Sequence, residues 1–135
     1  MEGAGRPHGA TKVGADALTI VNSHAHLVVR VKDVVLADTY NPIVLLEGTH
    51  PVRYYIRPAD VRRELLPMVR TTSHCPLKGD AKYFAGKIGE HVVMDIAWVY
   101  DDPVPGAERI AGMIAFYNEK VDIDIDGEPQ RRPRA

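Results

Sequence analysis

The chain of 135 residues has the length of one ordinary domain, long enough to bury a core without a disulfide or a structural metal. Its 17 basic and 18 acidic residues give a formal net charge of −1, which excludes the strongly basic field of a typical nucleic-acid-binding protein. A single cysteine excludes an internal disulfide and a four-cysteine zinc site, and no apolar run has the length of a membrane span.

Two tails are predicted to flank the domain. Residues 1–14 are rich in glycine and alanine, so we expect a disordered N-terminal tail. Residues 128–135 mix arginine and proline, which predicts a flexible basic tail. Residues 15–127 contain no repeat and no linker, so we expect a single domain. We expect it in the cytoplasm, as a monomer or homodimer, without a membrane or nucleic-acid partner.

Short apolar runs predict strands in the first half of this domain. Leu27, Val29 and Val31 alternate with polar neighbours, which is the pattern of a half-buried strand. Further strands are predicted over residues 34–37, 43–46 and 52–56.

One helix is predicted after these strands. Pro58 suits the first helical position, where its missing N–H would have no partner anyway. Asp60 is favoured in the first turn by the helix dipole, and Val61 and Leu65 share a face. Pro67 ends the helix.

Hairpins are predicted in the second half. A strand over residues 82–88 leads through a two-residue turn at 89–90 into a strand with strict alternation. We expect one face of that strand to form core or pocket wall, and its residues are Val92, Met94, Ile96, Trp98 and Tyr100. One helical turn is predicted over 107–111, and a last hairpin joins 113–117 to 121–125. The sequence therefore predicts a mainly β domain of antiparallel sheets with one or two short helices.

Residues 70–80 hold the only cysteine, a proline directly behind it, and the pair Lys78-Gly79. This Cys-Pro-x-Lys-Gly run, followed by Trp98-x-Tyr100, resembles a bacterial family catalogued as domain of unknown function 427 and sometimes labelled nucleotidyltransferase-like. Segments 47–51, 55–62 and 110–117 share the resemblance, which spans about residues 23–124. It implies a compact, tent-like β fold in which two antiparallel sheets meet at an angle.

Cys75 is the candidate catalytic residue. Pro76 holds it extended, and Lys78 is near enough in sequence to stabilise a thiolate if the loop curls back. His74 would point to the opposite face, so a base would have to come from elsewhere, such as His50. The alternative is that Cys75 is a buried small hydrophobe.

Lys78 is the candidate anion-binding residue. Lys78-Gly79 is not a phosphate loop, because such loops need several glycines and a Ser or Thr that opens a helix. Together with Arg62 or Arg70, Lys78 could still bind one phosphate or carboxylate. The alternative is a tight turn with a solvated lysine.

A small-molecule pocket is predicted where aromatic and polar groups converge. Phe116 could join its aromatic wall. Glu47 is either a general base in the pocket or the structural partner of Arg62. No metal site and no cofactor are indicated. The predicted ligand-binding residues are Glu47, Arg62, Thr72, Lys78, Gly79, Tyr83, Trp98 and Tyr100.

Three functions remain open from the residues. We favour a small-molecule binding domain. An enzyme is the second, acting by nucleotidyl transfer or by thiol chemistry at Cys75, although the motifs offer no convincing acidic pair for Mg²⁺. An interaction module that uses an exposed sheet edge is the third.

Overall fold

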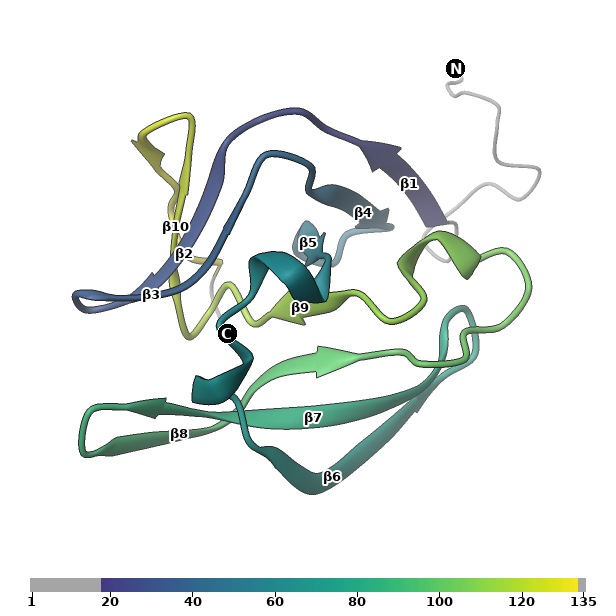
Figure 1. Ribbon diagram of the computed structural model, residues 1–135. Helices are drawn as coiled ribbons and strands as arrows, with labels where there is room; N and C mark the ends of the chain where they lie inside the picture. Colours follow the sequence, from purple (N-terminus) through teal and green to yellow (C-terminus); the bar gives the residue numbers. More distant parts are fainter. Residues whose placement is uncertain (1–17, 134–135) are drawn as a thin grey trace.

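The computed structural model describes residues 18–133, which form eleven strands in two antiparallel sheets (Figure 1). The mainly β fold class is thus confirmed. The expected tail at 1–14 lies outside the described residues. The larger sheet has seven strands in the order β1 (Leu18–Asn22), β4 (Ile43–Glu47), β5 (Arg53–Ile56), β9 (Ile114–Phe116), β8 (His91–Val99), β7 (Gly79–Ile88) and β6 (Met68–Cys75). The smaller sheet has four, in the order β11 (Glu128–Pro129), β10 (Asp122–Ile125), β2 (Leu27–Val31) and β3 (Val34–Thr39).

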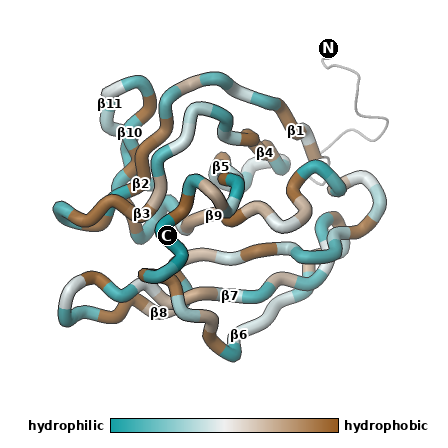
Figure 2. The backbone as a smooth tube through the Cα atoms, in the orientation of Figure 1, coloured by the Kyte–Doolittle hydropathy of each residue, from teal (hydrophilic) through white to brown (hydrophobic). Residues whose placement is uncertain are grey.

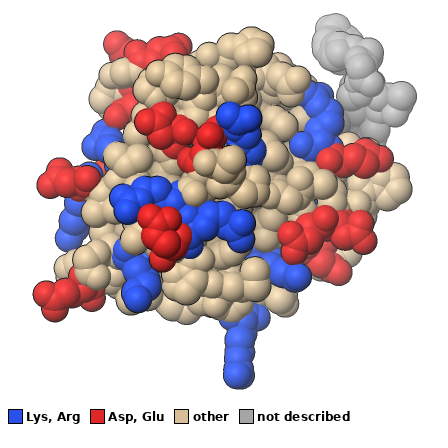
Figure 3. All heavy atoms as spheres, in the orientation of Figure 1, with Lys and Arg blue, Asp and Glu red and all other residues tan. Residues whose placement is uncertain are grey.

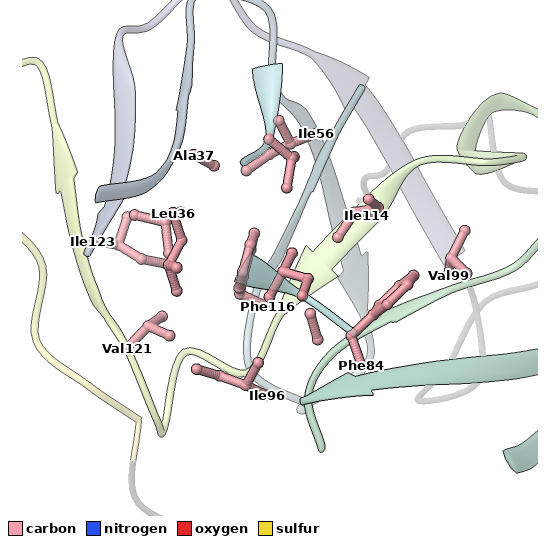
Figure 4. Close-up of a cluster of buried hydrophobic side chains, with 14 of the residues drawn as sticks. Leu36, Ala37, Ile56, Phe84, Ile96, Val99, Ile114, Phe116, Val121 and Ile123 are labelled. Atoms are coloured by element: carbon pink, nitrogen blue, oxygen red, sulfur yellow. The ribbon is translucent and has the colours of Figure 1, made fainter. Parts of the chain in front are cut away.

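An inter-sheet core joins the two sheets. Leu36 and Ile123 of the smaller sheet lie opposite Ile96 and Phe116 of the larger one (Figure 4). Apolar and polar stretches are interleaved along the strands, as Figure 2 shows, because successive side chains of a strand point to opposite faces. Each buried large side chain of this core contributes about 1.5–3 kcal/mol relative to an exposed one.

A second buried cluster covers the opposite face of the larger sheet. Tyr55 and Ile56 are neighbours on β5, yet Ile56 belongs to the inter-sheet core and Tyr55 to this second cluster. Tyr83 and Phe84 divide in the same way on β7. We call this face of the larger sheet the outer face, and it carries the aromatic side chains described below.

The prediction of one helix between Pro58 and Pro67 is wrong. The segment forms two 3₁₀ turns, Pro58–Asp60 and Arg63–Leu65, separated by Val61 in an extended conformation. Val61 forms an isolated bridge with Ala37 of β3 and is only 8% exposed. Burial of this valine against the core therefore outweighs the local preference for a continuous helix.

The prediction that one face of β8 is buried along its whole length is also wrong. The turn at Gly89-Glu90 and the β7–β8 hairpin are as predicted, but the register shifts between Phe84 and Gly86. Asp95 has φ of 53°, a conformation that interrupts the strand pleat. As a result Val92 and Met94 are exposed at 59% and 53%, and Ile96 joins the inter-sheet core. Trp98 and Tyr100 remain together in the second cluster.

The last predicted hairpin does not form. Residues 113–117 contribute β9 to the larger sheet, whereas residues 121–125 contribute β10 to the smaller sheet. Asn118 donates a hydrogen bond to the carbonyl of Val52 at 2.8 Å, which holds the intervening turn on the larger sheet. The chain then crosses to pair with β2 instead of folding back on β9.

Residues 128–133, expected to belong to a flexible tail, contact the domain. Glu128 pairs with Ile125, and Arg132 forms an ion pair with Asp122 at 3.0 Å. Among residues 18–133, no helix has the length and apolarity needed to cross a membrane. Acidic and basic groups are interspersed on the face drawn in Figure 3.

Candidate functional site

A row of side chains on the outer face forms the floor of the site. Tyr55, Ala115, Trp98 and Tyr83 lie directly beside one another on β5, β9, β8 and β7. Ala115 is small, so the indole N–H of Trp98 reaches across it to the hydroxyl of Tyr55 at 3.0 Å. This buried hydrogen bond fixes the indole plane, because a buried N–H without an acceptor would be costly.

A cavity of about 190 Å³ lies above this floor. Leu45 and Glu47 reach it from β4, Arg53 from β5, and Lys78 from the β6–β7 turn. The complete lining consists of Leu45, Glu47, His50, Pro51, Arg53, Lys78, Tyr83, Trp98, Tyr100 and Tyr117.

The turn that carries Lys78 is held by the loop after β8. The N–H of Lys78 donates to the carbonyl of Cys75, and its own carbonyl accepts from the N–H of Val104 at 3.0 Å. Gly79 follows with φ of +117°, and a Cβ there would lie 3.3 Å from the Cα of Pro103. Glycine therefore permits both the backbone conformation and the close approach of the loop.

Glu47 and Lys78 form an ion pair at one side of the cavity. The Nζ of Lys78 lies 2.7 Å from Oε1 of Glu47, and the side chains are 11% and 15% exposed. The ammonium also lies 5.8 Å from the ring centre of Tyr100. The pair joins β4 to the β6–β7 turn, which lie near opposite edges of the sheet, and so closes the cavity on that side.

Tyr117 packs beside Trp98 and Tyr83 of the floor, and we call these three rings the aromatic wall. The centroids of Trp98 and Tyr117 are 4.5 Å apart, and Tyr83 stacks with Tyr117 at 6.4 Å and 17°. The hydroxyl groups of Tyr83 and Ser73 are hydrogen bonded at 2.8 Å. Such a wall offers flat apolar surface edged by polar groups.

Arg53 lies against this wall. Its guanidinium is 5.4 Å from the ring centre of Trp98 and 5.3 Å from that of Tyr117. It forms two hydrogen bonds with Glu119, at 2.7 and 3.2 Å, and one with Asn118 at 3.3 Å. These bonds hold the pKa of Glu119 below its usual value, so the carboxylate stays ionised and anchors the guanidinium.

Burial determines the protonation state of the tyrosines near the cavity. Desolvation is the main cause that raises the pKa of Tyr55, Tyr100 and Tyr117 well above the usual value of 10.0. Their hydroxyl groups are therefore neutral hydrogen-bonding groups at neutral pH.

A comparison with family profiles assigns the chain to a family. A profile described as "Domain of unknown function (DUF427)" matches residues 19–127. The chain belongs to the DUF427 family. The match includes every residue that lines the cavity. No curated protein matches the chain.

Five of the residues predicted for the small-molecule pocket meet at the cavity. They are Glu47, Lys78, Tyr83, Trp98 and Tyr100. Gly79 packs against the backbone of the loop after β8 and is not part of the lining.

Three further predicted residues lie outside the lining. Arg62 is exposed and pairs with Glu64 at 2.9 Å, so the expected pairing of Glu47 with Arg62 is wrong. Thr72 is exposed on β6. Cys75 is half-buried against the second cluster, and within residues 18–133 its thiol has no hydrogen bond to a base.

The sequence interpretation missed two important lining residues. Phe116 was expected in the wall, but it points into the inter-sheet core, and its neighbour Tyr117 lines the cavity instead. Arg53 was not proposed at all. Alternation along the strands was the available signal, because Arg53 shares a face with Tyr55, and Tyr117 with Ala115.

Within residues 18–133, no group of three or more His, Cys, Asp or Glu side chains is placed to hold a metal ion. His26 lies 2.6 Å from a carboxylate oxygen of Asp38, and its ring stacks on that of Tyr40.

Proposed function

We propose that this DUF427 protein binds a small molecule in the cavity on the outer face of the larger sheet. Trp98, Tyr83 and Tyr117 would contact its flat surface, and Lys78 and Glu47 would orient its polar groups. The observation that supports this proposal is the convergence of aromatic rings and a few fixed polar groups on one cavity, the usual composition of a ligand site. We place this binding in the bacterial cytoplasm.

An enzymatic role has weaker support. The family's short label suggests nucleotidyl transfer, which uses several carboxylates to hold Mg²⁺ beside the phosphates. Among the described lining residues Glu47 is the single carboxylate, and it is already paired with Lys78. Cys75 lies outside the lining, so we do not extend the proposal to thiol chemistry.

Thermal unfolding with a panel of metabolites tests the proposal. A ligand present at 100 times its Kd stabilises the folded state by about 2.7 kcal/mol, which is a readily measured rise in Tm. Trp98 is the single tryptophan, so its fluorescence should change with the same ligand. A panel that gives neither a Tm shift nor a fluorescence change would refute the proposal.

Variants locate the binding. Trp98→Ala should abolish the response, but it removes a buried ring and costs about 3–5 kcal/mol of stability. Tyr117→Ala, at a half-buried position of the same wall, is the second variant and should weaken binding without that penalty. Met94→Ala is the control, because Met94 lies on β8 like Trp98 but is 53% exposed and away from the cavity.

A further inference from the structure

The size of the cavity favours a small ligand. The cavity volume is about 190 Å³. Sites for drug-sized molecules begin at about 300 Å³. Tyr117, which is half-buried, offers a flat ring most of the contact surface of the wall, because Trp98 and Tyr83 are only 5% and 9% exposed.

The two cationic side chains of the cavity retain N–H donors without an acceptor among the described residues. Lys78 donates to Glu47, and within residues 18–133 its other N–H groups have no acceptor. Arg53 uses part of its five N–H groups on Asn118 and Glu119, and the rest are unused in the same part of the chain. A ligand that satisfies these groups must supply acceptor oxygens.

Each cation of the cavity already has one carboxylate partner. Arg53 and Lys78 are two cations, and Glu47 is the one described carboxylate of the lining. Glu119 anchors Arg53 but is not a lining residue. The two cations and the two carboxylates therefore balance, and a carboxylate ligand is favoured by charge-assisted hydrogen bonds to the free N–H groups and not by an excess of positive charge.

We propose that the ligand is a small planar aromatic or heteroaromatic carboxylate. Its ring lies against Tyr117, and its carboxylate accepts hydrogen bonds from Lys78. This inference rests on the proposed binding function and specifies its ligand class. Unlike a neutral ligand, such an anion is repelled by Glu47 and competes with Glu47 for the N–H groups of Lys78.

Two matched pairs of probes test the inference by calorimetric titration at pH 7. Benzoate is compared with benzamide, and nicotinate with nicotinamide, since each pair differs in the charge of one substituent. The carboxylates should bind at least roughly tenfold more tightly than the amides. Inorganic phosphate serves as a third probe and should bind more weakly than benzoate, because it lacks the ring.

The variant Glu47→Gln provides the second test. It removes the opposing charge and leaves Lys78 available, so it should strengthen benzoate binding by roughly tenfold while leaving benzamide binding nearly unchanged. Lys78→Met should weaken benzoate binding selectively. The melting curve of each variant shows that it is folded at the temperature of the titration.

The inference fails if the amides bind as tightly as the carboxylates, if Glu47→Gln weakens benzoate binding, or if phosphate binds better than benzoate. It also fails if none of the ring compounds binds. The metabolite panel distinguishes failure of this inference from failure of the binding function. A neutral metabolite that raises the Tm of the wild type but not that of Tyr117→Ala would support binding in the cavity and would show that the ligand is not a carboxylate.

Discussion

The ion pair between Glu47 and Lys78 should be a strongly coupled element of the fold. The N–O distance is 2.7 Å and the side chains are 11% and 15% exposed. At an effective dielectric constant of about 20, two unit charges at that distance attract by about 6 kcal/mol. Desolvation of both ions offsets most of this attraction, and their residual exposure reduces the rest, so we expect a net coupling of about 2 kcal/mol.

A double-mutant cycle measures this coupling. Lys78→Met and Glu47→Leu each leave one charge without its partner, and each should lower the free energy of unfolding by about 2–3 kcal/mol in urea titrations. The double variant should be less destabilised than the sum of the two, because it leaves no unpaired charge. Additivity within about 0.5 kcal/mol would refute the reasoning, since it would mean that water already solvates both groups.

Three further predictions concern the surroundings of the cavity. Gly79→Ala should lower Tm more than Gly106→Ala, because both glycines have positive φ but only a Cβ at Gly79 would meet a neighbouring backbone. Trp98→Phe should cost about 1–3 kcal/mol in urea titrations, because it leaves the hydroxyl of Tyr55 without its donor, and an equal stability of the two proteins would contradict that bond. For Glu119, whose pKa is lowered in the folded state, the stabilisation is present above the unfolded value of 4.5 and is lost as pH falls through the folded value. Acid titration of Glu119→Gln should therefore show a smaller loss of stability below pH 4.5 than the wild type, and identical slopes would contradict this assignment.

Most of the local strand and turn signals were read correctly from the sequence, although β1, β6 and β11 were not predicted. The alternation around Leu27 and the two-residue turn at Gly89-Glu90 depend on side chains only a few positions apart. The helix after Pro58 failed because Val61 pairs with Ala37, more than twenty positions earlier in the chain. No local pattern in that segment reports such a partner.

The aromatic wall was predicted in part. Trp98 and Tyr100 were expected together and lie together, but the same alternation wrongly included Val92 and Met94. The kink at Asp95 separates the two groups. A polar residue at positive φ within a strand gives little advance signal, because Asp95 lies where the register of β8 with β7 shifts, and that shift is a property of the paired strands.

Residue order alone determined that this chain makes short antiparallel strands with tight turns, because the two-residue period and the turn chemistry are properties of adjacent positions. The order of the strands in the two sheets was decided only in three dimensions. Glu47 meets Lys78 across 31 positions, and Arg53 meets Glu119 across 66. Which charges meet depends on which strands become neighbours and how the sheet curves, and that outcome is a sum of contacts over the whole chain.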